Sequence, residues 1–170
     1  MSCYVVSVDT VRLLVGACDR YELDRVLADA YPYDNRWRDG SDDDKRGMVL
    51  RYVLSVNARA VLYRYPTDTV DTMPGSVGDV EWQWDTQYRP MPAVEYVPLP
   101  FRTSTGPGEE MSEHVARRVL GAAHCLAYQC CELPEWESTP AYRWLNRLHW
   151  RAGSALSEGW EVDDVREAVA

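Results

Sequence analysis

Long hydrophobic runs are missing from this sequence. None of its apolar stretches approaches the roughly 20 residues that a helix needs to cross a bilayer. The first residues, Met-Ser-Cys-Tyr-Val-Val, also lack the basic start and the small-residue cleavage site of a secretory signal peptide. We therefore expect a protein that acts in the cytoplasm and does not associate with a membrane.

Cysteine is present, but not in the pattern of a disulfide framework. Small secreted domains held by disulfides carry an even number of cysteines, whereas this chain of 170 residues has five. Most of them lie on the apolar faces of predicted helices, where free cysteines are commonly buried. We expect free thiols without a bound metal ion at Cys3, Cys18, Cys125, Cys130 and Cys131.

Positive charge is scarce. Lys and Arg total 18 against 27 Asp and Glu, which gives a net charge of −9 and a pI of about 4.8. Non-specific binding to nucleic acid needs a basic surface, so we expect no direct nucleic-acid partner. The acidic balance is compatible with ordinary solubility and with recognition of a basic partner.

The usual signatures of catalysis are also absent. The sequence has no glycine-rich phosphate loop, no nucleophile elbow and no paired-carboxylate signature. Gly106-Pro-Gly108 precedes a predicted helix but lacks the lysine and serine of a phosphate loop. We therefore expect no cofactor, and we favour a non-enzymatic protein.

Histidine and cysteine residues gather near the end of one predicted helix. They are His124, Cys125, Cys130 and Cys131, with His114 and His149 elsewhere in the chain. Structural zinc sites favour Cys-x-x-Cys spacing on turns, whereas this cluster lies within a helix. A Cys–His nucleophile would also need an oxyanion site beside it. A small enzyme or zinc protein that uses this cluster stays open as an alternative.

The clearest pattern in the sequence is a pair of helices within residues 113–156. Ser112 is a good N-cap for the first helix, and Pro134 stops it. Thr139 can cap the second helix, with Pro140 at its first position. Apolar residues recur at three- and four-residue spacing in both: Val115, Val119, Ala122, Leu126 and Cys130, then Ala141, Leu145, Leu148, Ala152 and Leu156. We predict an antiparallel helical hairpin whose two apolar stripes face each other.

The first part of the chain predicts further helices. Helical patterns cover residues 8–18, 23–30 and 41–56, and turn-forming residues at 31–40 indicate a loop. Residues 60–65 fit a short helix or a strand, and periodicity does not decide between them. At the other end of the chain, residues 163–170 predict a short terminal helix.

Residues 66–107 differ from the rest of the chain. They hold seven of the ten prolines, which disfavours helices there. Residues 80–84 and 94–97 alternate apolar and polar side chains, which predicts a β-hairpin. We interpret this segment as a partner-binding insertion outside the folding core, with Trp82 and Trp84 as binding residues. The alternative is a loop over the helical core whose tryptophans fill gaps.

Three arginines lie on one face of the last predicted long helix. Arg143, Arg147 and Arg151 recur every four residues, and Trp144 and Trp150 flank them. Arginine and tryptophan are enriched at interface hot spots, so we predict partner binding by these five side chains. The alternative is internal pairing with nearby acids, which are Glu132, Glu135, Glu137 or the acidic C-terminus.

Several short motifs resemble a family of small proteins from bacteriophages, prophages and plasmids. They are the Met-Ser-Cys-Tyr start at residues 1–4, Tyr-Gln-Cys-Cys-Glu at 128–132 and Trp-Glu-Ser-Thr-Pro-Ala-Tyr at 136–142. The stretch at 57–65 is also similar, whereas residues 66–107 do not match. The resemblance implies an origin in a mobile element, and it implies no reaction mechanism.

Together these patterns predict a mainly α fold, a compact helical domain over residues 1–170 with an irregular or β-hairpin insertion. We expect an accessory protein that binds a host protein in the cytoplasm of a bacterial host. Inhibition of a host defence system is the most concrete form of this hypothesis. The alternatives are an enzyme or zinc protein that uses the Cys/His cluster and a structural component of an oligomer, and a homo-oligomer remains open.

Overall fold

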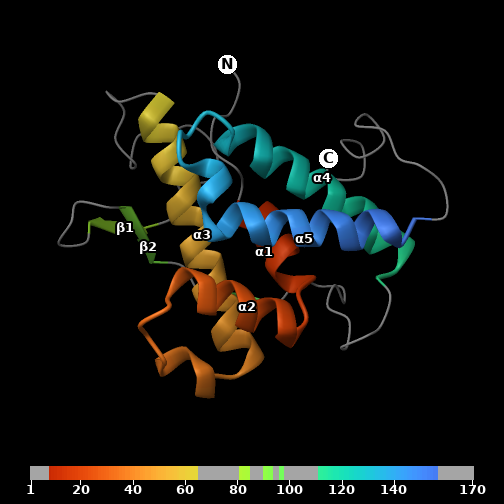
Figure 1. The fold of residues 1–170 in the computed structure, drawn as a ribbon, viewed down its shortest axis with the longest axis horizontal. Helices are drawn as coiled ribbons and strands as arrows, with labels where there is room; N and C mark the ends of the chain where they lie inside the picture. Colours follow the sequence, from red (N-terminus) through yellow and green to blue (C-terminus); the bar gives the residue numbers. More distant parts are fainter. Residues whose placement is uncertain (1–7, 65–80, 85–89, 94–95, 98–110, 157–170) are drawn as a thin grey trace.

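The computed structural model describes residues 8–64, 81–84, 90–93, 96–97 and 111–156 (Figure 1). This part of the chain is mainly helical, as the sequence predicts. Its long elements are α1 (Val8–Gly16), α2 (Arg20–Ala30), α3 (Asp42–Arg64), α4 (Glu113–Cys130) and α5 (Pro140–Ser154). Shorter elements are the 3₁₀ turns η1 (Arg36–Asp39) and η4 (Trp136–Ser138) and the strands β1 (Glu81–Trp84) and β2 (Pro90–Ala93).

Helix α1 forms the centre of the core. Six of its nine residues are buried, and Val11, Leu14 and Val15 have no exposed surface. The helix packs against both α3 and α4. A helix that is apolar on most of its faces is stable in water only when neighbours cover it, so α1 sets how the longer helices are arranged.

Helices α4 and α5 form the predicted antiparallel hairpin and lie side by side (Figure 1). Leu126 of α4 and Leu148 of α5 are buried in the common core. The start of α5 is also tied to α3, because the backbone N–H of Ala141 donates to the hydroxyl of Tyr52 at 3.2 Å. Burial raises the pKa of Tyr52 to about 12, so this hydroxyl stays neutral and available.

Side-chain caps fix where the helices begin. The Ser112 hydroxyl accepts the N–H of Val115 at the start of α4, and Thr139 caps α5, which has a proline in its first turn. Both starts confirm the sequence prediction. Asp19 and Glu22 form a capping box at α2, which the sequence did not single out. The predicted terminal helix over 163–170 lies outside the described residues.

Helix α3 is continuous over 23 residues. The sequence left residues 60–65 open between a helix and a strand, and the described residues 60–64 are helical. Asn57 does not end the helix, because its buried amide contacts the Cys130 sulfur at 3.7 Å. Helix α3 contacts α1, α2 and α4, so it buries residues on several faces and shows no single apolar stripe. That is why periodicity alone did not settle its length.

The β-hairpin exists, but its second strand is not the predicted one. Strand β1 matches the prediction, whereas β2 is Pro90–Ala93 and not residues 94–97. The strands are antiparallel, with Trp84 opposite Pro90. Proline lacks an N–H, and it is tolerated here because each strand of a two-stranded sheet is an edge strand. The alternating pattern over 94–97 therefore misidentified the strand, because Tyr96 packs against the core instead.

The hairpin lies beside α3 (Figure 1). Tyr96 is half-buried, and the guanidinium carbon of Arg46 lies 6.0 Å from its ring centroid. Tyr96 thus contacts the core, and the independence of the rest of residues 66–107 stays a prediction. Within the described ranges, no helix is long and apolar enough to cross a membrane.

Two tryptophans of α5 offer a matched test of this fold. Trp144 is completely buried, whereas Trp150 is 76% exposed. We expect Trp144→Ala to lower the free energy of unfolding by about 3–5 kcal/mol, because it opens a cavity in the core. Trp150→Ala should change it by less than about 0.5 kcal/mol. Urea denaturation of both variants measures the difference, and similar losses would contradict the packing of α5.

Candidate functional site

The arginine face of α5 lies against α2, and its two ends are held by ion pairs. At one end, Arg143 donates two hydrogen bonds to the Asp29 carboxylate, at 2.8 and 2.9 Å. It also donates to the carbonyl oxygen of Ser138 at 2.9 Å. Both partners of the ion pair are partly exposed, so this contact fixes the orientation of Arg143 and contributes little stability.

The other end is more deeply buried. Arg151 donates to both oxygens of Glu22, at 2.8 and 2.9 Å, and to the carbonyl oxygen of Ala17 at 3.2 Å. The two side chains are only 19% and 15% exposed. Burial raises the pKa of Glu22, and the charge of Arg151 opposes that rise. Glu22 also accepts the backbone N–H of Asp19, so one carboxylate joins the start of α2 to α5.

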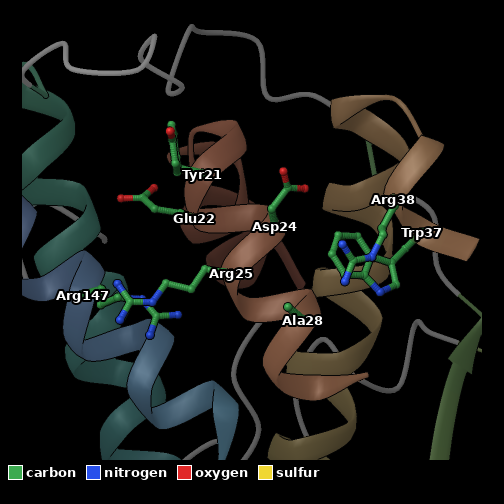
Figure 2. Close-up of a pocket in the computed structure, with 8 residues that line it drawn as sticks. All are labelled: Tyr21, Glu22, Asp24, Arg25, Ala28, Trp37, Arg38 and Arg147. Carbon is green, nitrogen blue, oxygen red and sulfur yellow. The ribbon is translucent and has the colours of Figure 1, made fainter. Parts of the chain in front are cut away.

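The middle arginine has a different environment. Nε and Nη2 of Arg147 are buried, and no group among the described residues accepts a hydrogen bond from either. Burial lowers the pKa of Arg147, and the neighbouring charge of Arg25 lowers it further. Figure 2 shows Arg25 extending from α2 toward Arg147. Two cations therefore face each other where the outer arginines each face a carboxylate.

A cavity of about 670 Å³ opens beside this pair of cations (Figure 2). We name it the α2–α5 groove, and its lining residues are Tyr21, Glu22, Asp24, Arg25, Ala28, Trp37, Arg38 and Arg147. Its volume lies in the range of ligand pockets, so it can hold one or two side chains of a bound segment.

The far end of the groove is aromatic. Trp37 of η1 is 6% exposed, and its indole Nε1 has no hydrogen-bond partner among the described residues. The guanidinium carbon of Arg38 lies 5.1 Å from the Trp37 ring centroid, and the Lys45 ammonium lies 5.9 Å from it. Lys45 is held by Asp24 at 2.7 Å. The groove thus combines an apolar wall with hydrogen-bond donors.

The three predicted arginines do share one face, but the acids that pair with two of them are not the expected ones. The sequence-based alternative named Glu132, Glu135, Glu137 and the C-terminus, whereas Asp29 and Glu22 both belong to α2. Glu135 lies 3.8 Å from Arg59. Partners separated by more than 100 positions depend on how α2 packs against α5, which sequence spacing does not reveal.

The predicted tryptophans do not form one surface. Trp144 lies in the core, where its indole N–H donates to the Cys18 sulfur at 3.1 Å. This burial corrects its placement among the partner-binding residues. Trp150 is exposed as predicted. Trp82 and Trp84 lie in β1, and their side chains are outside what the structure describes.

The predicted Cys/His cluster does not converge in the described part of the chain. Cys130 is buried against Asn57, Cys131 is exposed, and His124 and Cys125 are half-buried. Burial lowers the pKa of His149, with a smaller effect from His124, while His114 is exposed on α4. Within the described residues, no three His, Cys, Asp or Glu side chains come close enough to hold a metal ion.

Of the residues that line the groove, sequence reasoning singled out only Arg147. It assigned residues 31–40 to a loop, and so did not single out Trp37, and it read Arg25 as part of an ordinary amphipathic helix. The available signal was the Arg-Trp-Arg run at 36–38, which has the residue types of an interface hot spot. The position of Arg25 opposite Arg147 had no local signal.

The two outer ion pairs differ in burial, and this difference should appear in stability. Removing Arg151 leaves the Glu22 carboxylate buried without its main partner, so we expect Arg151→Ala to cost about 3 kcal/mol. Arg143→Ala breaks a more exposed pair and should cost about 0–1 kcal/mol. Urea denaturation at pH 7 measures both, and equal costs would contradict the assigned burial.

The cysteines should differ in reactivity. Cys18 and Cys130 have no exposed surface, and burial raises the pKa of the Cys18 thiol, whereas Cys131 is exposed. We expect iodoacetamide to modify Cys131 in the native protein and to reach Cys18 and Cys130 only after denaturant is added. Peptide mapping by mass spectrometry identifies the modified positions. Rapid modification of Cys18 in native protein would show that the core opens readily.

Comparison with known proteins identifies no relative of this chain. No family model matches the chain, and neither a curated protein nor a solved structure is significantly similar to it. The resemblance to phage and plasmid proteins therefore stays a prediction, and function has to be argued from the groove itself.

Proposed function

We propose that this chain is a non-enzymatic accessory protein of a phage or other mobile element that binds a protein of its bacterial host. The α2–α5 groove is the binding surface, and inhibition of a host defence system is the most specific form of the proposal. The mobile-element origin rests on the sequence motifs, and the choice of surface rests on the chemistry of the groove.

One observation carries the proposal: the groove combines a nearly buried tryptophan with two arginines that form no ion pair among the described residues. In the described part of the chain, the ion pairs around the groove are Arg143–Asp29, Arg151–Glu22 and Lys45–Asp24, and none of them includes Arg25 or Arg147. Tryptophan and arginine in a desolvated pocket are the residue types that dominate protein interfaces. The groove therefore has the composition of an interface centre.

The charge of the whole chain favours a protein partner over a nucleic acid. The net charge is −9, and the groove itself is bordered by the carboxylates Glu22 and Asp24. The net negative charge of the chain repels a polyanion as a whole. A protein segment can present one acidic side chain to the arginine pair and keep neutral residues elsewhere.

Affinity capture with matched variants tests this function. Tagged wild-type protein, Arg25→Ala/Arg147→Ala and the control Arg59→Ala/Arg117→Ala are each incubated with lysates from candidate bacterial hosts, and captured proteins are identified by mass spectrometry. The control removes the same charge from α3 and α4, where both arginines are in partly exposed ion pairs. Isothermal titration with the purified partner then measures affinity.

We expect one host protein to be captured by the wild type and the control, with at least roughly tenfold weaker binding to the groove variant, because interface hot spots contribute about 2 kcal/mol or more. Circular dichroism confirms that the variants are folded. Equal affinity for all three proteins would reject the groove as the binding surface. The absence of any specific partner across suitable hosts would reject the function.

A further inference from the structure

The facing side chains of α2 and α5 carry opposite charges at both ends of the contact between the helices and like charges in the middle. On α5, Arg143, Arg147 and Arg151 are spaced by four residues. On α2, Glu22, Arg25 and Asp29 are spaced by three and four, so they also share one face. The outer positions form the pairs Arg151–Glu22 and Arg143–Asp29, whereas the middle position brings Arg147 to Arg25.

The unsatisfied groups at the groove are all hydrogen-bond donors. Among the described residues, Nε and Nη2 of Arg147 and Nε1 of Trp37 are buried without an acceptor. The carboxylates around the groove already have cationic partners, since Glu22 binds Arg151, one oxygen of Asp24 binds Lys45, and Asp29 binds Arg143. Buried polar groups in folded proteins normally have partners, so a set of donors alone indicates that the missing partner carries acceptors.

We propose that Arg25 and Arg147 form a receptor for a carboxylate, supplied by an Asp or Glu side chain of the protein partner. The inference rests on the proposed function and specifies the chemistry of its site. A planar guanidinium donates two parallel hydrogen bonds to a carboxylate, and a second arginine balances the remaining charge. The bound carboxylate takes the place that Glu22 and Asp29 occupy opposite the outer arginines.

The lining of the groove also indicates which kind of partner side chain lies near the bound carboxylate. Ala28 and Trp37 line its apolar wall, and Trp37 also offers the indole N–H. The partner segment would therefore carry an acidic side chain for the arginine pair and an apolar side chain for this wall. An acidic side chain from a partner protein satisfies the donors without adding the repeated negative charge of a nucleic acid.

This chain also contains a competing source of carboxylates. The residues after α5 include Glu158, Glu161, Asp163, Asp164 and Glu167. If one of them filled the receptor, neutralising it would free the site for an external anion. The variant Asp163→Asn/Asp164→Asn therefore belongs in the test.

The first arm of the test measures small-anion binding directly. The arginine Nε–Hε resonances are followed by NMR during titration with sodium acetate, at ionic strength held constant with chloride. We expect saturating shifts at Arg25 and Arg147 and none at Arg143, which already binds Asp29. Equal shifts in chloride alone, or no saturation, would show that the two arginines do not form a receptor.

Tighter binding of inorganic phosphate than of acetate would overturn the carboxylate assignment. Stronger acetate binding by Asp163→Asn/Asp164→Asn would overturn the assignment to a partner protein.

The second arm uses a substitution that completes the pattern of charges. Arg25→Glu places a carboxylate opposite Arg147, as Glu22 and Asp29 stand opposite the outer arginines. We expect this variant to melt at a higher temperature than the wild type and to lose the acetate response completely. A lower melting temperature, with the acetate response kept, would show that the two arginines do not form one site.

The third arm separates this inference from the proposed function. Arg147→Lys keeps the charge but loses the planar pair of donors, and Arg143→Lys is the matched control on the same helix. With the purified partner, we expect at least tenfold weaker binding for Arg147→Lys and less than a twofold change for the control. Equal affinities would reject the carboxylate receptor while leaving partner binding intact. Loss of partner capture by the wild type would instead reject the function.

Discussion

The contact between the Glu22 carboxylate and the Arg151 guanidinium joins three parts of this structure. The carboxylate accepts the Asp19 backbone N–H in the capping box of α2, and it binds the Arg151 guanidinium of α5. Arg151 in turn donates to the Ala17 carbonyl, just after α1. A buried carboxylate is stable only when such donors surround it, so this contact and the Arg143–Asp29 pair together fix the register of α2 against α5.

That register decides what the middle of the interface contains. With Glu22 and Asp29 held opposite Arg151 and Arg143, the intervening position of α2 has to face Arg147. The residue there is Arg25, and the two cations border a groove instead of closing it. The arginine pair of the proposed binding site is therefore a direct result of the contacts that stabilise the fold, since α2 and α5 supply both.

Local signals in the sequence predicted the helices better than the site. Ser112, Thr139 and Pro140 mark helix starts through their immediate neighbours, so the α4–α5 hairpin could be predicted closely. Trp144 was misplaced because it was read as flanking the arginines, although Leu148 lies one turn farther on the buried face. The groove could not be predicted, because Arg25, Trp37 and Arg147 come to line one groove only through the tertiary packing of α2, η1 and α5.

The opposed arginines have a consequence for the lifetime of a complex. In the free protein, Arg25 and Arg147 repel each other, and a bound carboxylate removes that repulsion. Dissociation has to restore the like-charge contact and leave buried donors unpaired, so its barrier is higher than the buried area alone implies. Association needs no comparable rearrangement. A binding site built in this way gains residence time more than encounter rate.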